Sequence, residues 1–147
     1  TEAHHQTVHH VGPESLDAFL ASCQAVVCLL PLTPAAEGIL NRQTLSRLRP
    51  GAHVINVARG AHVVDEDLIA LIDEGHLGGA TLDVFRQEPL PPEHPFWSHP
   101  RIRLTPHTSA RTLRGESIRQ IVDKIAQAAS GVPWPQIGGW VDRQRGY

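Results

Sequence analysis

The sequence predicts an α/β fold in which helices flank a parallel β-sheet. Two observations lead to this prediction. Short, mainly apolar runs alternate with amphipathic segments of helical length, and Pro, Gly or polar residues close the runs. The runs of strand length are Ala25–Leu30, Ala52–Val57, Gly79–Phe85 and Arg101–Thr105. Apolar strands separated by helices are typical of a parallel sheet that is covered on both faces.

Four segments carry helical signals. They are Ser15–Ser22, Asn41–Leu48, Asp65–Glu74 and Arg111–Ala129. Asn41 and Asp65 stand where N-cap residues are preferred, and Gly75 is suited to stop the third helix. The last segment is the longest, and apolar residues recur along one of its faces at helical spacing: Ile118, Ile121, Val122, Ile125 and Ala129.

Three stretches are not expected to form a helix or a strand. Arg49-Pro50-Gly51 has the composition of a turn. Glu88–Pro100 contains five prolines, which remove backbone donors and exclude regular structure. The tail from Gly131 is rich in Gly, Pro and Trp. We expect it to pack on a partner domain or subunit.

The composition is that of an ordinary soluble domain. The 147 residues are about one domain's worth, with 41% hydrophobic and 19% charged residues. A formal net charge of -2 gives no electrostatic reason to bind nucleic acid or an anionic membrane, so we expect neither partner. No apolar run approaches ~18 residues, and the N-terminus lacks a signal-peptide pattern. We expect a cytoplasmic protein, and the absence of Met predicts a piece of a longer chain.

The cysteines and the N-terminal histidines are given structural interpretations. Cys23 and Cys28 flank or enter an expected core strand without a basic neighbour, which favours reduced packing residues over a disulfide. A histidine cluster near the N-terminus comprises His4, His5, His9 and His10. Metal ligation is one reading of this cluster. A flexible surface segment is favoured, because no cysteine or acid lies at a convincing ligand spacing.

Polar residues of catalytic type follow three of the expected strands. Arg59 follows the second strand, and His107 follows the fourth. Asp83 lies near the end of the third strand, and Glu88 comes five residues later. In parallel sheets the carboxyl ends of the strands share one edge, where ligands bind. We therefore expect these four residues to converge on one rim.

Such a set supports one known kind of chemistry. A guanidinium binds a substrate carboxylate through a two-pronged pair and polarises a neighbouring carbonyl. An imidazolium gives a proton to the developing alkoxide, and a nearby carboxylate favours the protonated ring. Together with a hydride donor, these groups would reduce a 2-oxo acid to a 2-hydroxy acid.

Each of these residues also has an interpretation in which it has no catalytic role. Arg59 alone is a common surface cation, and Glu88 before a proline is a common solvated loop residue. The cap of the long helix is an alternative role for His107, Thr108 or Ser109. Asp83 is the exception, because a buried carboxylate needs a donor from the protein or from a ligand. The occurrence of all of them on one rim favours a functional site.

Three linked motifs carry a family resemblance. The elements ARG at 58–60, LDVFRQEPLP at 82–91 and PH at 106–107 lie within one stretch of about 80 residues. In order and spacing, this stretch resembles the D-isomer-specific 2-hydroxyacid dehydrogenases. The RQEPLPP segment and the ending VDRQRGY are most similar to the bacterial glyoxylate/hydroxypyruvate reductase A branch.

The resemblance implies roles for individual residues. Arg59 would bind the substrate, His107 would donate the proton, and Glu88 would be the acid paired with His107. Asp83 would hold the nicotinamide carboxamide, and Gly60 would turn the backbone tightly at positive φ. The residues that would line the cofactor are Leu30, Pro31, Val57, Ala58, Arg59, Asp83, His107, Ser109 and Ala110.

The sequence departs from the family pattern. The GxGxxG fingerprint that seats the pyrophosphate is absent, as are the residue that selects NAD or NADP and the substrate domain. Ser109 stands where family members often have Gly or Ala. The resemblance therefore implies a Rossmann-like parallel sheet that is the second half of a cofactor-binding domain. Residues 1–147 would form one partial domain, with strand and helix units at 13–110, a long helix at 111–130 and a tail at 131–147.

The parent protein implied by the resemblance reduces glyoxylate or hydroxypyruvate to a D-2-hydroxy acid. The resemblance to the glyoxylate/hydroxypyruvate reductase branch favours NADPH over NADH as the cofactor. We expect the parent protein to be a homodimer, and we expect the isolated chain to be weakly active or inactive. One alternative is a dinucleotide-sensing, corepressor-like binding protein. Another is an inert dimerisation module that uses the long helix and the Trp-bearing tail.

Overall fold

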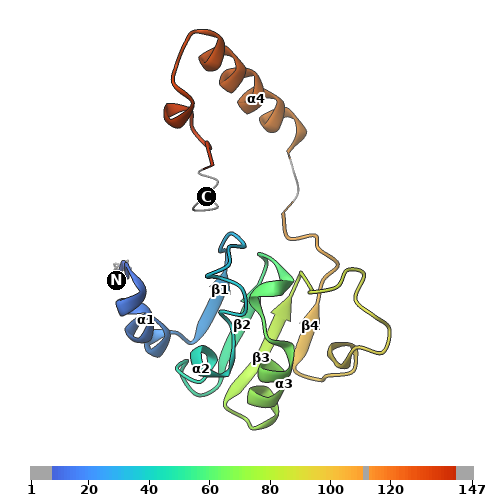
Figure 1. Cartoon of the computed structure of the whole chain (residues 1–147). Helices are drawn as coiled ribbons and strands as arrows, with labels where there is room; N and C mark the ends of the chain where they lie inside the picture. The colour runs from blue at the N-terminus through green and yellow to red at the C-terminus, as the bar shows by residue number, and fades with distance from the viewer. Residues whose placement is uncertain (1–7, 111–112, 142–147) are drawn as a thin grey trace, which may run out of the picture.

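The computed structural model describes residues 8–110 and 113–141. It contains one four-stranded sheet in the order β1-β2-β3-β4, and every neighbouring pair is parallel. The strands are β1 (Ala25–Cys28), β2 (Ala52–Asn56), β3 (Leu77–Leu82) and β4 (Ile102–Leu104). Each lies within or close to an expected run, so the α/β fold with a parallel sheet is confirmed (Figure 1).

The expected helices are present but shorter. They are α1 (Leu16–Ser22), α2 (Arg42–Leu45), α3 (Asp65–Asp73) and α4 (Arg114–Ala129). Asn41 caps α2 as predicted, because its side chain accepts a hydrogen bond from the amide of Thr44 at 3.2 Å. The prediction that Asp65 caps α3 is wrong, since Val64 is the N-cap and Asp65 is the first helical residue. Residues 111 and 112, expected in the last helix, lie outside the described residues.

The turns and the proline-rich segment follow the sequence signals. Gly51 and Gly75 both have φ of +79°, which fits the expected turn and the helix stop. Residues 88–100 are irregular apart from one 3₁₀ turn at Pro95–Trp97. That turn places Phe96 in the core.

The core lies on one face of the sheet. Val26 and Cys28 of β1 are buried, whereas Val27 between them is 50% exposed. Against the buried face pack helix residues such as Leu68 and Ile72, which are fully buried. The expectation that both faces are covered is therefore wrong for the described residues. Because the strands follow one another across the sheet, right-handed crossovers place their helices on the same side.

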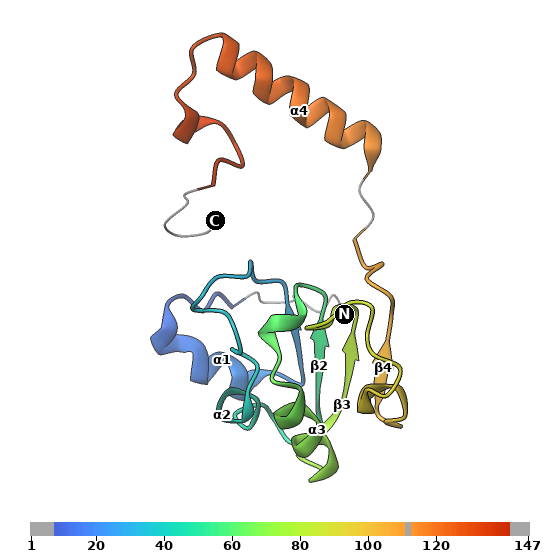
Figure 2. The ribbon, with the colours of Figure 1, turned by 45° about the vertical axis from the view of Figure 1, so that its right-hand side comes forward.

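Helix α4 stands apart from the sheet in both views (Figures 1 and 2). Within the described residues α4 has no buried side chain. The apolar face predicted from the sequence is exposed, with Ile121 at 57% and Ile125 at 63%. Trp134 and Trp140 of the tail are exposed as well. That this tail packs on another domain or subunit stays a prediction.

The structure describes both cysteines and two of the four N-terminal histidines. Cys23 and Cys28 are free thiols, and burial raises the pKa of Cys28. His9 and His10 are exposed, while His4 and His5 lie outside the described residues. No helix in the described part of the chain has the length and apolar character needed to cross a membrane.

Candidate active site

The turn after β2 is shaped by two buried polar side chains. Asn56, at the end of β2, accepts from the amide of Ala58 at 3.1 Å and donates to the carbonyl of Arg59 at 2.8 Å. His62 accepts from the amide of Arg59 at 3.2 Å through Nδ1. The same Nδ1 lies 2.9 Å from the carbonyl oxygen of Arg59, and Nε2 lies 3.4 Å from the carbonyl oxygen of Pro31. Asn56 and His62 thus fix the main chain that carries Arg59.

Arg59 itself is exposed at the rim of the sheet. Its Nη1 donates to the carbonyl of Ala58 at 2.6 Å. A cavity of about 540 Å³ lies here, and the predicted cofactor residues that line it are Leu30, Pro31, Val57, Ala58 and Arg59. The structure therefore brings these five predicted residues together from the ends of β1 and β2.

Gly60 has a different role from the one expected. Its φ is not positive, so the expectation of a left-handed turn is wrong. A Cβ atom built on Gly60 would overlap the main chain of Phe85 and Arg86. Glycine is required here because two backbone segments touch: the one after β2 and the one after β3.

Asp83 follows β3 and is 1% exposed. Its Oδ1 accepts from the Thr108 amide at 2.9 Å and from the Thr105 hydroxyl, and its Oδ2 accepts from the Ser109 amide at 2.9 Å. Burial raises the pKa of Asp83, but hydrogen bonds from Ser109, Thr105 and Thr108 outweigh it and lower the pKa well below the ordinary value. The donor that the sequence required for Asp83 is therefore supplied by the protein.

His107 sits in the turn that Asp83 holds. Its φ is +51°, in the left-handed region that residues other than Gly rarely adopt. Its amide donates to the carbonyl of Asp83 at 2.9 Å. The alternative that His107, Thr108 or Ser109 caps the long helix is wrong, because α4 has Leu113 as its N-cap. A strained backbone at a polar, half-exposed residue is typical of a functional site.

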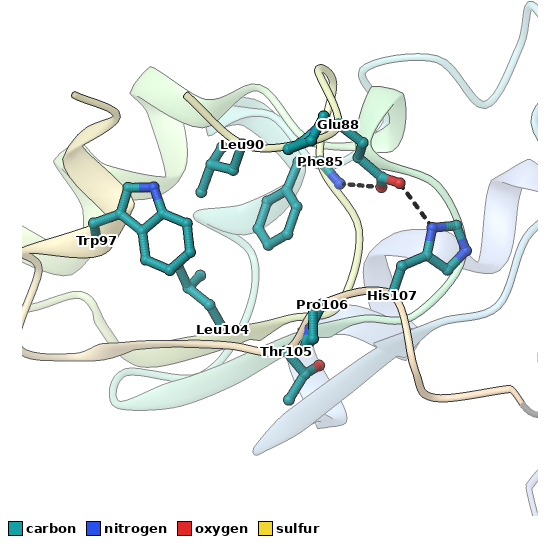
Figure 3. A pocket seen from close by; sticks show the side chains of 9 residues that line it. Phe85, Glu88, Leu90, Trp97, Leu104, Thr105, Pro106 and His107 are labelled. Carbon is teal, nitrogen blue, oxygen red and sulfur yellow. Dashed lines mark hydrogen bonds and ion pairs between the residues drawn. The ribbon is translucent and has the colours of Figure 1, made fainter. Parts of the chain in front are cut away.

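Glu88 and His107 form a direct pair (Figure 3). Oε2 of Glu88 lies 2.8 Å from Nδ1 of His107, and Oε1 accepts from the amide of Phe85 at 2.9 Å. The pKa of Glu88 is lowered by the hydrogen bond from His107, then by the Phe85 amide, with the charge of Arg59 also contributing. Glu88 is thus an exposed loop residue whose two carboxylate oxygens are both hydrogen-bonded within the protein. The imidazole of His107 and the charge of Arg59 thus both act on the carboxylate of Glu88.

The pair lies at one end of a second cavity of about 630 Å³ (Figure 3). Its walls are mainly apolar, and they include Phe85, Leu90, Trp97 and Leu104. The indole of Trp97 donates to the carbonyl of Pro91 at 2.9 Å, which fixes its ring on the proline-rich loop. The sequence marked this loop only as irregular and did not predict that it builds a wall.

A family model described as "D-isomer specific 2-hydroxyacid dehydrogenase, NAD binding domain" matches residues 1–109. The chain belongs to this family. The Rossmann-like sheet described above is thus part of the NAD-binding domain of a 2-hydroxyacid dehydrogenase.

Solved structures of other members are similar over most of this chain. A dehydrogenase of the family from Xanthobacter autotrophicus Py2, in complex with NADPH and MES, is 42% identical with a TM-score of 0.86 over 92% of this chain and 55% of that one. An NADPH-dependent glyoxylate/hydroxypyruvate reductase from Sinorhizobium meliloti, in complex with NADP and sulfate, is 37% identical with a TM-score of 0.85 over 93% and 44%.

A probable 2-hydroxyacid dehydrogenase from Rhizobium etli CFN 42, in complex with NADP, HEPES and L(+)-tartaric acid, is 33% identical. Its TM-score is 0.84 over 97% of this chain and 46% of that one. The chain therefore spans about half the length of the relatives it matches.

The residues around Arg59 and Asp83 are suited to bind one part of a dinucleotide. The cavity beside Arg59 is bordered by the ends of β1 and β2, and Asp83 fixes the turn that continues through Ser109 to the exposed Ala110. The 147 residues contain no glycine-rich turn of the type that seats a pyrophosphate. These residues can therefore border a part of a dinucleotide other than its pyrophosphate.

Several residues that build the site were not predicted. Asn56 carried a signal, because it is a polar residue inside an otherwise apolar strand. His62 and Thr105 carried none, since their roles depend on contacts with Pro31 and Asp83, which are distant in the sequence.

Proposed function

We propose that the protein containing this chain reduces small 2-oxo acids, of the glyoxylate or hydroxypyruvate type, to D-2-hydroxy acids. The observation that carries the proposal is the Glu88–His107 pair at 2.8 Å, on the same rim as Arg59. NADPH is the favoured cofactor, because relatives at 42% and 37% identity were crystallised with NADPH or NADP.

Each residue has a distinct part in the proposed reaction. Arg59 is exposed, and its guanidinium binds the substrate carboxylate and polarises the adjacent carbonyl. His107 gives a proton to the carbonyl oxygen, while Glu88 holds Nδ1 and leaves Nε2 for the substrate. The hydrogen bond from His107 lowers the pKa of Glu88, so Glu88 is a carboxylate when it holds Nδ1. When bound, the reduced nicotinamide supplies the hydride.

The nicotinamide would be held by residues at the ends of three strands and in the turn after the fourth. They are Leu30, Pro31, Val57, Ala58, Arg59, Asp83, His107, Ser109 and Ala110. Since three hydrogen bonds from the protein already reach Asp83, a carboxamide would be an additional donor to it.

The proposal also covers the domain organisation, the oligomeric state and the location of the protein. One partial domain would comprise the strand and helix units up to Ala110, the helix α4 (Arg114–Ala129) and the tail that begins at Gly131. A cytoplasmic homodimer stays our prediction for the whole protein. The sensor and dimerisation alternatives are not carried further, because the relatives above are named as dehydrogenases and reductases.

The main test is Arg59→Ala in the intact protein, assayed with hydroxypyruvate and NADPH. We expect kcat/KM to fall at least ~100-fold, because the substrate loses its charge-assisted clamp, while the Kd of NADPH changes less than about twofold. Arg47→Ala is the control, since Arg47 pairs with Asp17 in α1 and is not on the rim. Unchanged turnover by Arg59→Ala would refute the proposal.

A second test addresses Glu88. In Glu88→Gln we expect the acid-to-neutral limb of the rate–pH profile to shift, because the carboxylate that pairs with Nδ1 of His107 is replaced by a neutral amide. A profile that coincides with wild type would exclude Glu88 from this role. Robust turnover by the isolated 147-residue chain would contradict our expectation that it is weakly active or inactive.

A further inference from the structure

Arg86 connects two backbone segments that carry proposed site residues. It lies in the turn between Phe85 and Glu88, and its side chain reaches the segment after β2. Nε donates to the carbonyl of Val63 at 2.9 Å, and Nη2 donates to the carbonyl of Ala61 at 3.1 Å. One planar guanidinium thus binds two carbonyls, in the chain that directly follows Arg59 and Gly60.

The main chains of these two segments also touch. The close approach of Gly60 to Phe85 and Arg86 leaves no room for a Cβ atom. The Arg86 side chain crosses the same junction. The contact at Gly60 sets how near the segments lie, and the fork of Arg86 resists their sliding or rotating past one another.

Acidic neighbours favour the guanidinium in this position. Nη1 of Arg86 lies 3.8 Å from Oε1 of Glu37. The charge of Arg86 also acts on Asp65, whose other neighbours are Glu66 and His94, with Nε2 of His94 at 3.5 Å. These groups come from the loop after β1, from the start of α3 and from the proline-rich loop. Arg86 therefore lies where three elements meet the junction.

The position of Glu88 depends on the same short turn. Phe85 supplies the amide that binds Oε1 of Glu88, and His107 binds Oε2. Arg86 is the residue between that amide and the acid, next to Gln87. A rotation of the turn about Phe85 would carry Glu88 away from His107, and the two bonds to Ala61 and Val63 oppose that rotation.

We infer that Arg86 is a positioning residue that couples the Arg59 segment to the Glu88–His107 pair. It touches neither proposed substrate nor cofactor, and it acts by holding the turn of Glu88 against the segment after β2. The coupling is a geometric property of the chain. Only its consequence for turnover rests on the proposed function.

The test compares Arg86→Gln and Arg86→Lys in the 147-residue chain by NMR. The two readouts are hydrogen exchange of the Phe85 amide and the ¹³Cδ titration of Glu88. In Arg86→Gln we expect exchange to be about tenfold faster, as the turn loosens, and the pKa of Glu88 to rise toward the ordinary glutamate value. Arg86→Lys should be intermediate, because an ammonium can reach one carbonyl but cannot form the fork.

Arg101→Gln is the matched control. Arg101 also donates to a backbone carbonyl, that of Ile72, and its side chain is 40% exposed, against 41% for Arg86. We expect neither readout to change in this variant. Unchanged readouts in a folded Arg86→Gln chain would overturn the inference. Faster exchange of all amides together would also overturn it, because Arg86 would then serve general stability.

A turnover measurement separates this inference from the proposed function. In the intact protein we expect Arg86→Gln to lower kcat by about tenfold with the Kd of NADPH unchanged. If Arg59→Ala leaves turnover intact while Arg86→Gln still frees Glu88, the proposed function fails and the coupling stands. If Arg86→Gln leaves Glu88 in place while Arg59→Ala abolishes turnover, the coupling fails and the function stands.

Discussion

The sheet unit, residues 8–110, and the C-terminal segment, residues 113–141, use similar apolar side chains with opposite results. In the sheet unit, Ile72 of α3 is fully buried against the strands. In the C-terminal segment, Ile121 of α4 is 57% exposed, and α4 as described contributes no residue to the core. An amphipathic pattern therefore predicts that a helix has an apolar face. It does not predict which part of a structure covers that face.

The largest expected difference is between two identical substitutions, one in each region. Ile72→Ala should lower the free energy of unfolding by about 2–5 kcal/mol, because it leaves a cavity in the core. Ile121→Ala should change it by less than about 0.5 kcal/mol, because the side chain is already hydrated. Urea unfolding of the 147-residue chain measures both. Equal losses would show that the α4 face is covered in solution.

Two glycines sharpen the comparison at the level of the backbone. Gly60→Ala should cost about 1–3 kcal/mol, because its Cβ would overlap the main chain of Phe85. Gly115→Ala in α4 meets no atom within 4 Å and should increase helicity, since alanine is the better helix former. Urea unfolding and far-UV circular dichroism provide the two readouts. A neutral Gly60→Ala would mean that the two segments separate easily.

Asp83 gives the sheet unit a pH dependence of its stability. Its pKa is lowered in the folded state, so its contribution is fully present above about pH 5 and is lost as pH falls toward the folded value. Asp83→Asn should cost about 1.5 kcal/mol at neutral pH, because an amide donor would face the Ser109 amide. Its stability should also vary less with pH below about 5. An unaltered pH dependence would contradict this assignment.

The smallest effect is expected from removing the C-terminal segment entirely. A chain that ends at Ala110 should unfold with a free energy within about 0.5 kcal/mol of the 147-residue chain, because the sheet unit builds its own core. Its solubility should rise, since the exposed face of α4 is removed. A large loss of stability would show that α4 packs on the sheet unit.

The sequence predicted the fold well because strand and helix periods are local signals. The ends of elements were less accurate: Asp65 looked like a cap but is the first helical residue. The exposed face of the sheet was not predicted, because continuous apolar strands are typical of a sheet covered on both faces, and Val27 is nevertheless half-exposed. The exposed face results from the sequential strand order and the right-handed crossovers, which place the connecting helices on one side of the sheet.

The residues of the candidate site were proposed from the sequence, but the contacts that position them were not. Arg59, Glu88 and His107 could be identified because polar groups follow apolar strands. The support from Asn56, His62 and Arg86 could not, since each acts through backbone groups that only folding brings near. The true reason for Gly60 was equally hidden, because it is a neighbouring main chain and not a local torsion.

The left-handed residue at position 107 has one more consequence. Glycine would adopt that torsion without steric cost, yet the chain has a histidine there. Replacing it with glycine would relieve the local backbone and at the same time delete the imidazole that meets Glu88. Thermal stability and the proposed proton transfer thus make opposite demands on the side chain at position 107, and we expect a screen for heat resistance alone to favour glycine there.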